Sequence, residues 1–216
     1  VADINEAAAL RVARALGDNA SAFTVDVSNG EQVRALVAHC VDTFGPPDIV
    51  VNNAAITHKN QPMLDVDEAM FDRMFDVNVK SIYHMAQAVV PVMRQTGAGV
   101  ILNIGSTAGI RPGPGLSRYN GSKGAVNVLS KSMAVELGPD SIRVNAICPV
   151  MGIAGMVELL MGLPDTPENR AKFISSIPLG RFSTPKDVAA AAVFLASDAA
   201  AFLTGVELPV DGGRTV

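Results

Sequence analysis

The sequence lacks several features that would place it in particular protein classes. Its two cysteines, Cys40 and Cys148, show no CxxC or Cys/His spacing, so neither a disulfide framework nor a metal site is indicated. No segment reaches the roughly 18 consecutive apolar residues that span a bilayer, and no signal-peptide pattern opens the sequence. The formal net charge is −4 without any basic cluster, which argues against nucleic acid as a partner. We therefore expect a cytoplasmic protein with no bound metal, no membrane and no nucleic-acid partner.

The composition and the element pattern indicate one α/β domain. The 216 residues are 49% hydrophobic and 18% charged, as in a compact domain with a sizeable core. Apolar patterns predict strands at 22–26, 48–51, 100–104, 142–147 and 206–210. Helices are expected at 6–16, from a capping-box signature at 28–31 to Phe44, and at 67–93, 117–138 and 185–196. This alternation predicts a parallel sheet with helices on both faces, as a single domain 1–216 with a flexible helical flap at about 151–176.

The stretch SRYNGSK places Tyr119 and Lys123 four residues apart, after a loop rich in glycine and proline. On a helix that begins near Ser117, these two side chains share one face. Tyrosine normally keeps its proton until a pH of about 10, and a nearby positive charge lowers that pKa. The spacing therefore allows a general acid/base, although such a pair alone is more often two surface residues.

Two further polar residues stand near this pair. Ser106 ends the apolar run VILNIGS, and the carboxyl end of a buried strand is where open α/β sheets bind ligands. Asn78 interrupts a helical apolar pattern, where asparagine is locally unfavourable. These positions predict a cleft that Ser106 and Tyr119 share.

The sequence resembles the short-chain dehydrogenase/reductase family over nearly its whole length. The resemblance rests on NNAA at 52–55, Asn78, Ser106, the YxxxK of Tyr119 and Lys123, RVNAICP at 143–149 and TGVELPVDGG at 204–213. It implies a doubly wound Rossmann-type sheet and an NAD(P)-dependent oxidoreductase acting on alcohols or ketones. By this resemblance Tyr119 exchanges a proton with the substrate oxygen and Ser106 hydrogen-bonds that oxygen. Lys123 would lower the Tyr119 pKa and hold the nicotinamide ribose, and Asn78 would fix a water that links Lys123 to solvent.

The same resemblance implies the cofactor contacts. Besides Tyr119 and Lys123, the matching positions are Asp26 and Val27 at the adenine, Asn52 and Ala54 beside the ribose, Pro149 at the nicotinamide, and Asp3. Asp3 matches the acid that takes both adenosine ribose hydroxyls and repels a 2′-phosphate. No Arg or Lys follows Asp3 directly, which favours NAD over NADP.

Three departures from the family pattern concern the cofactor. The first strand, the glycine-rich turn and the first helix are lacking, and Val150 and Ala154 stand where glycine and threonine are usual. We expect the strand at 22–26 to lack a partner on the side that faces 48–51. This predicts either further residues upstream or a rearranged structure without cofactor.

The substrate is left open by the sequence. The flap is rich in Met and Leu, which suggests an apolar or adaptable pocket. The resemblance implies 3-oxoacyl thioesters, sugars, or cyclic and steroid-like alcohols as candidate substrates. The helices at 67–93 and 117–138 have more apolar positions than one core-facing stripe needs. By the resemblance these helices pair across a two-fold axis, which implies a homodimer or homotetramer. The alternatives are a catalytically silent subunit or scaffold, and a nucleotide-sugar epimerase or dehydratase with the same YxxxK pair.

Overall fold

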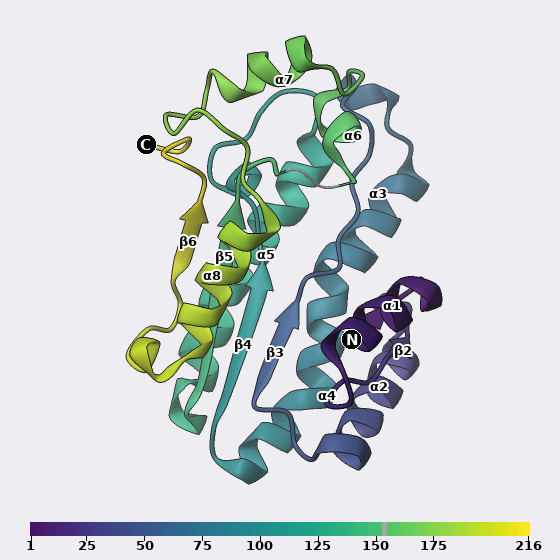
Figure 1. The fold of residues 1–216 in the computed structure, drawn as a ribbon, viewed down its shortest axis with the longest axis vertical. Coiled ribbons are helices and arrows are strands. Elements are labelled where there is room, and N and C mark those ends of the chain that lie inside the picture. Colours follow the sequence, from purple (N-terminus) through teal and green to yellow (C-terminus); the bar gives the residue numbers. More distant parts are fainter. Residues whose placement is uncertain (153–154) are drawn as a thin grey trace.

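The main sheet has four parallel strands. The computed structural model describes residues 1–152 and 155–216. Its larger sheet contains β3 (Ile49–Asn52), β4 (Gly99–Ile104), β5 (Ile142–Pro149) and β6 (Glu207–Val210), in the order β3-β4-β5-β6 (Figure 1). The register aligns Val50 with Ile101 and Ile101 with Val144. Parallel pairing brings the carboxyl ends of all four strands to one edge, as the alternating sequence pattern predicts.

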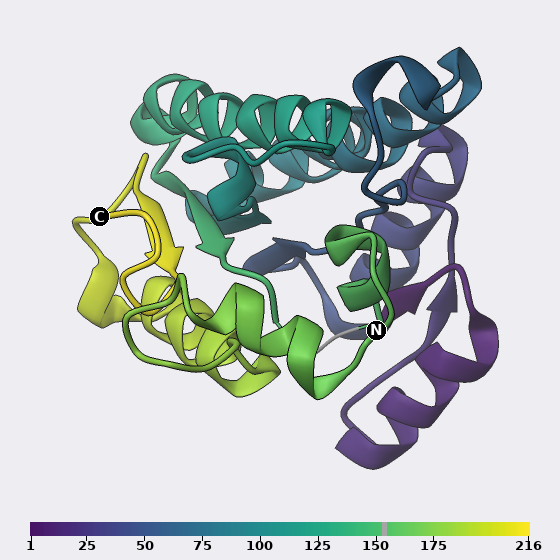
Figure 2. The ribbon, with the colours of Figure 1, turned by 90° about the horizontal axis from the view of Figure 1, so that it is seen from above.

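A second, two-stranded parallel sheet lies beside the first. It pairs β1 (Ala2–Asp3) with β2 (Phe23–Thr24), and β1 lies between β2 and β3 in both ribbon views (Figures 1 and 2). The prediction that the strand at 22–26 lacks a partner on that side is therefore wrong, because Ala2 and Asp3 are enough backbone to pair with it. In the described part of the chain, no ladder joins β1 to β3.

Helices cover both faces of the main sheet. The helices are α1 (Glu6–Leu16), α2 (Gly30–Phe44), α3 (Glu68–Phe75), α4 (Ser81–Thr96), α5 (Ser117–Leu137), α6 (Val157–Met161), α7 (Pro167–Ile174) and α8 (Pro185–Ala196). Seen from above, α5 lies on one side of the sheet and α8 on the other (Figure 2). Side chains alternate along β4 accordingly, since Ile101 packs in the core under α4 and α5 while Leu102 packs in the core under α8.

Local signals explain where several helices begin and end. Asn29 rather than Ser28 caps α2, because its side chain accepts hydrogen bonds from the backbone of Glu31 and Gln32. The helix expected at 67–93 is divided, with a π-helical turn (Asp76–Lys80) between α3 and α4. The segment expected as a flap carries the two short helices α6 and α7. None of the described helices is long and apolar enough to cross a membrane.

Candidate active site

A large cleft lies at the carboxyl edge of the main sheet. Its volume is about 710 Å³, and its walls come from the segments that follow β3, β4, β5 and β6, together with α5, the flap helices and α8. Open α/β sheets bind ligands at this edge, because the strand ends and the loops after them converge there.

Three predicted residues meet in this cleft. Ser106 follows β4 and caps a short 3₁₀ turn (Thr107–Gly109), where its Oγ accepts a hydrogen bond of 3.0 Å from the amide of Ala108. Tyr119 and Lys123 lie one turn apart on α5 and are buried, with 6% and 3% of their surface exposed. The Nζ of Lys123 lies 6.0 Å from the centre of the Tyr119 ring. All three residues line the cleft, so the structure brings them together as the sequence predicts.

The electrostatics of this group differ from the prediction. Burial raises the pKa of Tyr119 above its ordinary value of 10.0, and contact with the Ser106 hydroxyl lowers that pKa only in part. Burial also lowers the pKa of Lys123 to about 8, and its Nζ donates to the carbonyl of Ile104 at 2.8 Å. The predicted lowering of the Tyr119 pKa is therefore not what this structure shows, since burial raises that pKa by more than the Ser106 hydroxyl lowers it.

Asn78 links two segments that form walls of the cleft. It is buried in the π-helical turn, where its Oδ1 accepts from the amide of Ile56 at 2.8 Å. Its Nδ2 donates to the carbonyl of Ile56 and to Oγ of Ser122, at 2.9 and 3.0 Å. Ser122 in turn donates to the carbonyl of Tyr119 at 2.8 Å. Asn78 thus ties the loop after β3 to the first turns of α5, and its expected water link to Lys123 stays a prediction. The role of Ser122 has no separate signal in the sequence.

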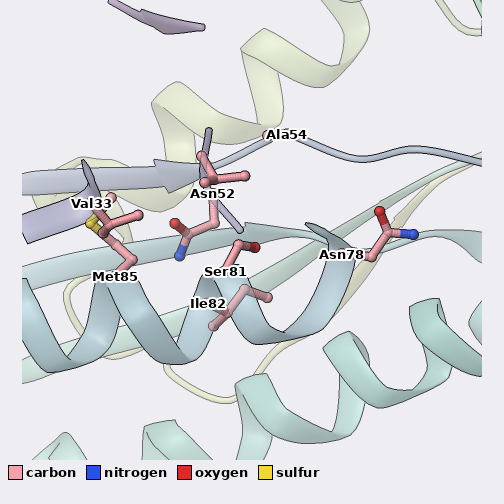
Figure 3. A pocket seen from close by; sticks show the side chains of 8 residues that line it. Val33, Asn52, Ala54, Asn78, Ser81, Ile82 and Met85 are labelled. Carbon is pink, nitrogen blue, oxygen red and sulfur yellow. The ribbon is translucent and has the colours of Figure 1, made fainter. Parts of the chain in front are cut away.

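The predicted ribose-loop residues turn away from the large cleft. Asn52 and Ala54 line a separate cavity of about 20 Å³ against α4, together with Val27 and Asn78 from other predicted contacts. Figure 3 shows Asn52, Ala54 and Asn78 around this cavity. The side-chain nitrogen Nδ2 of Asn52 donates to Oδ1 of Asn103 at 2.8 Å, which links β3 to β4. The alternate residues Val51, Asn53 and Ala55 face the cleft instead. Because successive residues of an extended segment point to opposite sides, the NNAA motif alone cannot tell which set faces a ligand.

The acids expected at the adenosine end lie beside the smaller sheet. Asp3 is exposed at the carboxyl end of β1, and one of its oxygens accepts from the amide of Asn5 at 2.8 Å. The cap of α1 is Asn5 rather than Asp3. Asp26 accepts hydrogen bonds from the side chain and amide of Ser28, which lower its pKa. The exposed carboxylate of Asp3 is suited to a pair of ribose hydroxyls, so the residues present fit a dinucleotide at this end.

At the nicotinamide end lie Pro149, a predicted cofactor contact, and Val150, which stands where the family usually has glycine. Pro149 ends β5 and lines the cleft. Val150 also lines it, and its amide donates to the carbonyl of Val210 at 3.1 Å. Ala154 lies outside the described residues.

The cysteines and other metal-binding side chains form no evident centre. Cys148 is buried, and burial raises the pKa of its thiol to about 12, so it behaves as a small apolar residue. Within residues 1–152 and 155–216, no group of three His, Cys, Asp or Glu side chains could hold a metal ion.

A doubly wound parallel sheet with serine, tyrosine and lysine at its carboxyl edge defines the class of nicotinamide-dependent α/β oxidoreductases. A family model described as "Enoyl-(Acyl carrier protein) reductase" matches residues 1–215. The chain belongs to the short-chain dehydrogenase/reductase family. It is an oxidoreductase that transfers hydride between NAD(H) and an alcohol or ketone.

Individual relatives support this assignment. The chain is 50% identical to 4-formylbenzenesulfonate dehydrogenase of Comamonas testosteroni, over 94% of this chain and 79% of that protein. It is 37% identical to a 3-oxoacyl-[acyl-carrier-protein] reductase of Haemophilus influenzae, over 97% of this chain and 84% of that protein. Among solved structures, 3-ketoacyl-(acyl-carrier-protein) reductase from Brucella melitensis complexed with NADH matches with a TM-score of 0.93 and 42% identity. That match covers 100% of this chain and 86% of the other. The described fold is therefore that of its relatives and is not rearranged.

Proposed function

We propose that Tyr119 is the general acid/base of the reaction and that Ser106 holds the reacting oxygen. The observation that carries this proposal is the convergence of Ser106, Tyr119 and Lys123 in one cleft. In the reducing direction, the Ser106 hydroxyl donates a hydrogen bond to the carbonyl oxygen and stabilises the charge that develops on it. The Tyr119 hydroxyl then gives its proton to that oxygen. The raised pKa of Tyr119 keeps the phenol in its protonated form before this step.

The remaining predicted residues hold and support the cofactor in this proposal. NAD(H), when bound, supplies or accepts the hydride. Asp3 accepts hydrogen bonds from the adenosine ribose, with Asp26 and Val27 at the adenine and Asn52 and Ala54 contributing backbone beside the ribose. Lys123 holds the nicotinamide ribose, Pro149 lies against the nicotinamide, and Asn78 keeps α5 in register with the loop after β3.

The proposed substrate is a small alcohol, ketone or aldehyde. Relatives are named for a formylbenzenesulfonate and for 3-oxoacyl carrier-protein thioesters, and a solved neighbour with 32% identity for xylitol. We propose to assay aryl aldehydes first, followed by 3-oxoacyl thioesters and sugar alcohols, by the change in NADH absorbance.

The assembly is proposed to be a homodimer or homotetramer in the cytoplasm. Tyr83 on α4 and Val128 and Val135 on α5 are exposed apolar side chains on helices that otherwise pack against the sheet. Pairing these helices across a two-fold axis would bury such residues.

Replacement of Tyr119 by phenylalanine tests the proposed chemistry. Tyr119→Phe should lower turnover by at least about 100-fold, because general acid–base catalysis typically contributes that much. Folding and cofactor binding should be retained. Tyr83→Phe is the matched control, since Tyr83 is the other tyrosine and lies exposed on α4. Near-normal turnover of Tyr119→Phe would contradict the assignment, and an unmodified protein that turns over no compound of the panel would favour a silent subunit.

A further inference from the structure

The charged side chains around the large cleft are all cationic. Among the described residues that line it, the charged ones are Arg111, Lys123 and Arg214, and none is an aspartate or glutamate. Lys123 belongs to the reacting group with Ser106 and Tyr119. The two arginines have no part in the proposed hydride or proton transfer, so their presence requires another explanation.

The two arginines are joined to each other at one side of the cleft. Arg111 follows the 3₁₀ turn after β4, and its Nη1 donates to the backbone carbonyl of Arg214 at 3.0 Å. A guanidinium has five N–H donors in a fixed fork that matches a carboxylate, so most of the donors of Arg111 are left for a ligand. In residues 1–152 and 155–216, neither arginine forms a salt bridge with an acidic side chain.

The turn that carries Arg214 is well fixed. Asp211 accepts hydrogen bonds from the amide of Gly213 at 2.9 Å and from the amide and hydroxyl of Thr215 at 2.8 and 2.7 Å. These bonds occupy both carboxylate oxygens of Asp211, which does not line the cleft. Asp211 therefore holds the backbone of the turn rather than neutralising Arg214 by direct pairing.

The adenosine end of a dinucleotide does not account for these arginines. The adenosine contacts proposed above lie at β1 and β2, on the β3 side of the sheet, whereas Arg214 follows β6 at the opposite edge. An anion held by Arg111 and Arg214 thus lies on the side of the substrate.

The rest of the cleft wall is mainly apolar. Leu116, Leu160, Phe173, Ile177 and Phe182 line it, and Met156 adds an adaptable side chain. We infer that the substrate is a carbonyl or alcohol compound with an apolar body that carries a carboxylate or sulfonate, and that Arg111 and Arg214 recognise this anionic group. The inference rests on the proposed function and adds the class of substrate and the residues that select it.

A matched pair of aldehydes tests this inference. With NADH as cosubstrate, kcat/KM for 4-formylbenzoate should exceed that for 4-formylbenzamide, a neutral compound of nearly the same shape, by tenfold or more. Arg111→Gln and Arg214→Gln should each lower kcat/KM for the acid by about tenfold, equivalent to about 1.4 kcal/mol, because each removes hydrogen bonds to a charged group. Both variants should leave kcat/KM for the amide nearly unchanged. Arg111→Lys keeps the positive charge, so it should lower kcat/KM for the acid by less than Arg111→Gln does.

Lys186→Gln is the control for net charge. Lys186 is exposed on α8 near the cleft but does not line it. Its replacement should therefore change kcat/KM for either aldehyde by no more than about twofold. An equal effect of Lys186→Gln and Arg214→Gln would overturn the specific role of the arginine.

Binding separates this inference from the proposed function. Calorimetric titration should show that benzoate binds more tightly than benzamide and that Arg111→Gln and Arg214→Gln abolish the difference. If neither aldehyde is reduced but benzoate shows this preference, the anion site stands while the proposed reaction on aldehydes fails. If benzamide binds as tightly as benzoate, or the amide is reduced as efficiently as the acid, the anion site is wrong whether or not the protein is active.

Discussion

Asn60 connects the flap to the walls of the cleft. Its amide nitrogen donates to the carbonyl of Leu160 on α6 and to the carbonyl of Pro114 in the loop before α5, both at 3.2 Å. Its backbone amide donates to the carbonyl of Leu159 at 2.8 Å. Asn60→Ala removes the two side-chain bonds and keeps the backbone bond, so it tests how firmly α6 is held over the cleft.

The expected magnitude follows from these two bonds. A hydrogen bond contributes a net 0.5–1.5 kcal/mol to stability, so losing both weakens the docking of α6 by about 1–3 kcal/mol. This is a change of about 5- to 150-fold in the local opening equilibrium, and the exposed bond to Pro114 favours the lower half of that range. Because α6 forms part of the cleft wall, KM for the substrate should rise as well.

Hydrogen–deuterium exchange measures this opening directly. Amides of residues 157–161 should exchange about 5-fold faster or more in Asn60→Ala, while amides in β4 and β5 should be unaffected. Asn60→Asp keeps the size of the side chain but loses the donor and turns a carboxylate toward two carbonyl oxygens. It should therefore accelerate exchange in residues 157–161 at least as much as Asn60→Ala does. Gln61→Ala is the control, because the Gln61 side chain donates to the carbonyl of Asp65 rather than to the flap. Unchanged exchange in Asn60→Ala, or an aspartate variant that behaves like the unmodified protein, would refute the reasoning.

Three further predictions concern pH, cofactor choice and assembly. The folded pKa of Lys123, about 8, lies below its ordinary value of 10.5, so the unfolded chain binds more protons between these values and the free energy of unfolding should rise with pH there. Urea denaturation of Lys123→Met should lack this rise, and an identical slope in both proteins would contradict the burial argument. Asp3→Ala should narrow the preference for NAD over NADP in kcat/KM, whereas an unmodified enzyme that works better with NADPH would show that Asp3 has another role. Val135, which is 82% exposed, should tolerate replacement by lysine without loss of Tm, while light scattering should show the oligomer dissociating; an unchanged mass would place the interface elsewhere.

The sequence by itself determined most of the elements and brought out the residues proposed as the reacting group, although the helix expected at 67–93 is divided. The expected helices at 6–16 and 185–196 have the same bounds in the structure, and each begins where expected because Asn5 and Thr184 are strong N-caps. The YxxxK spacing placed Tyr119 and Lys123 on one helical face, since that geometry depends only on the periodicity of a helix. Ser106 could be expected in the same cleft because the carboxyl ends of parallel strands meet at one edge.

Only the tertiary structure decided how these groups are tuned and which neighbours they meet. The pKa of Tyr119 is raised rather than lowered, because the pKa depends on how much water the packed cleft excludes as well as on the spacing to Lys123. Likewise Asn52 contacts Asn103 instead of the cleft, and Arg111 meets Arg214 from 103 residues away. Desolvation and long-range contacts arise from segments that folding alone brings together, so no local pattern in the chain could have specified them.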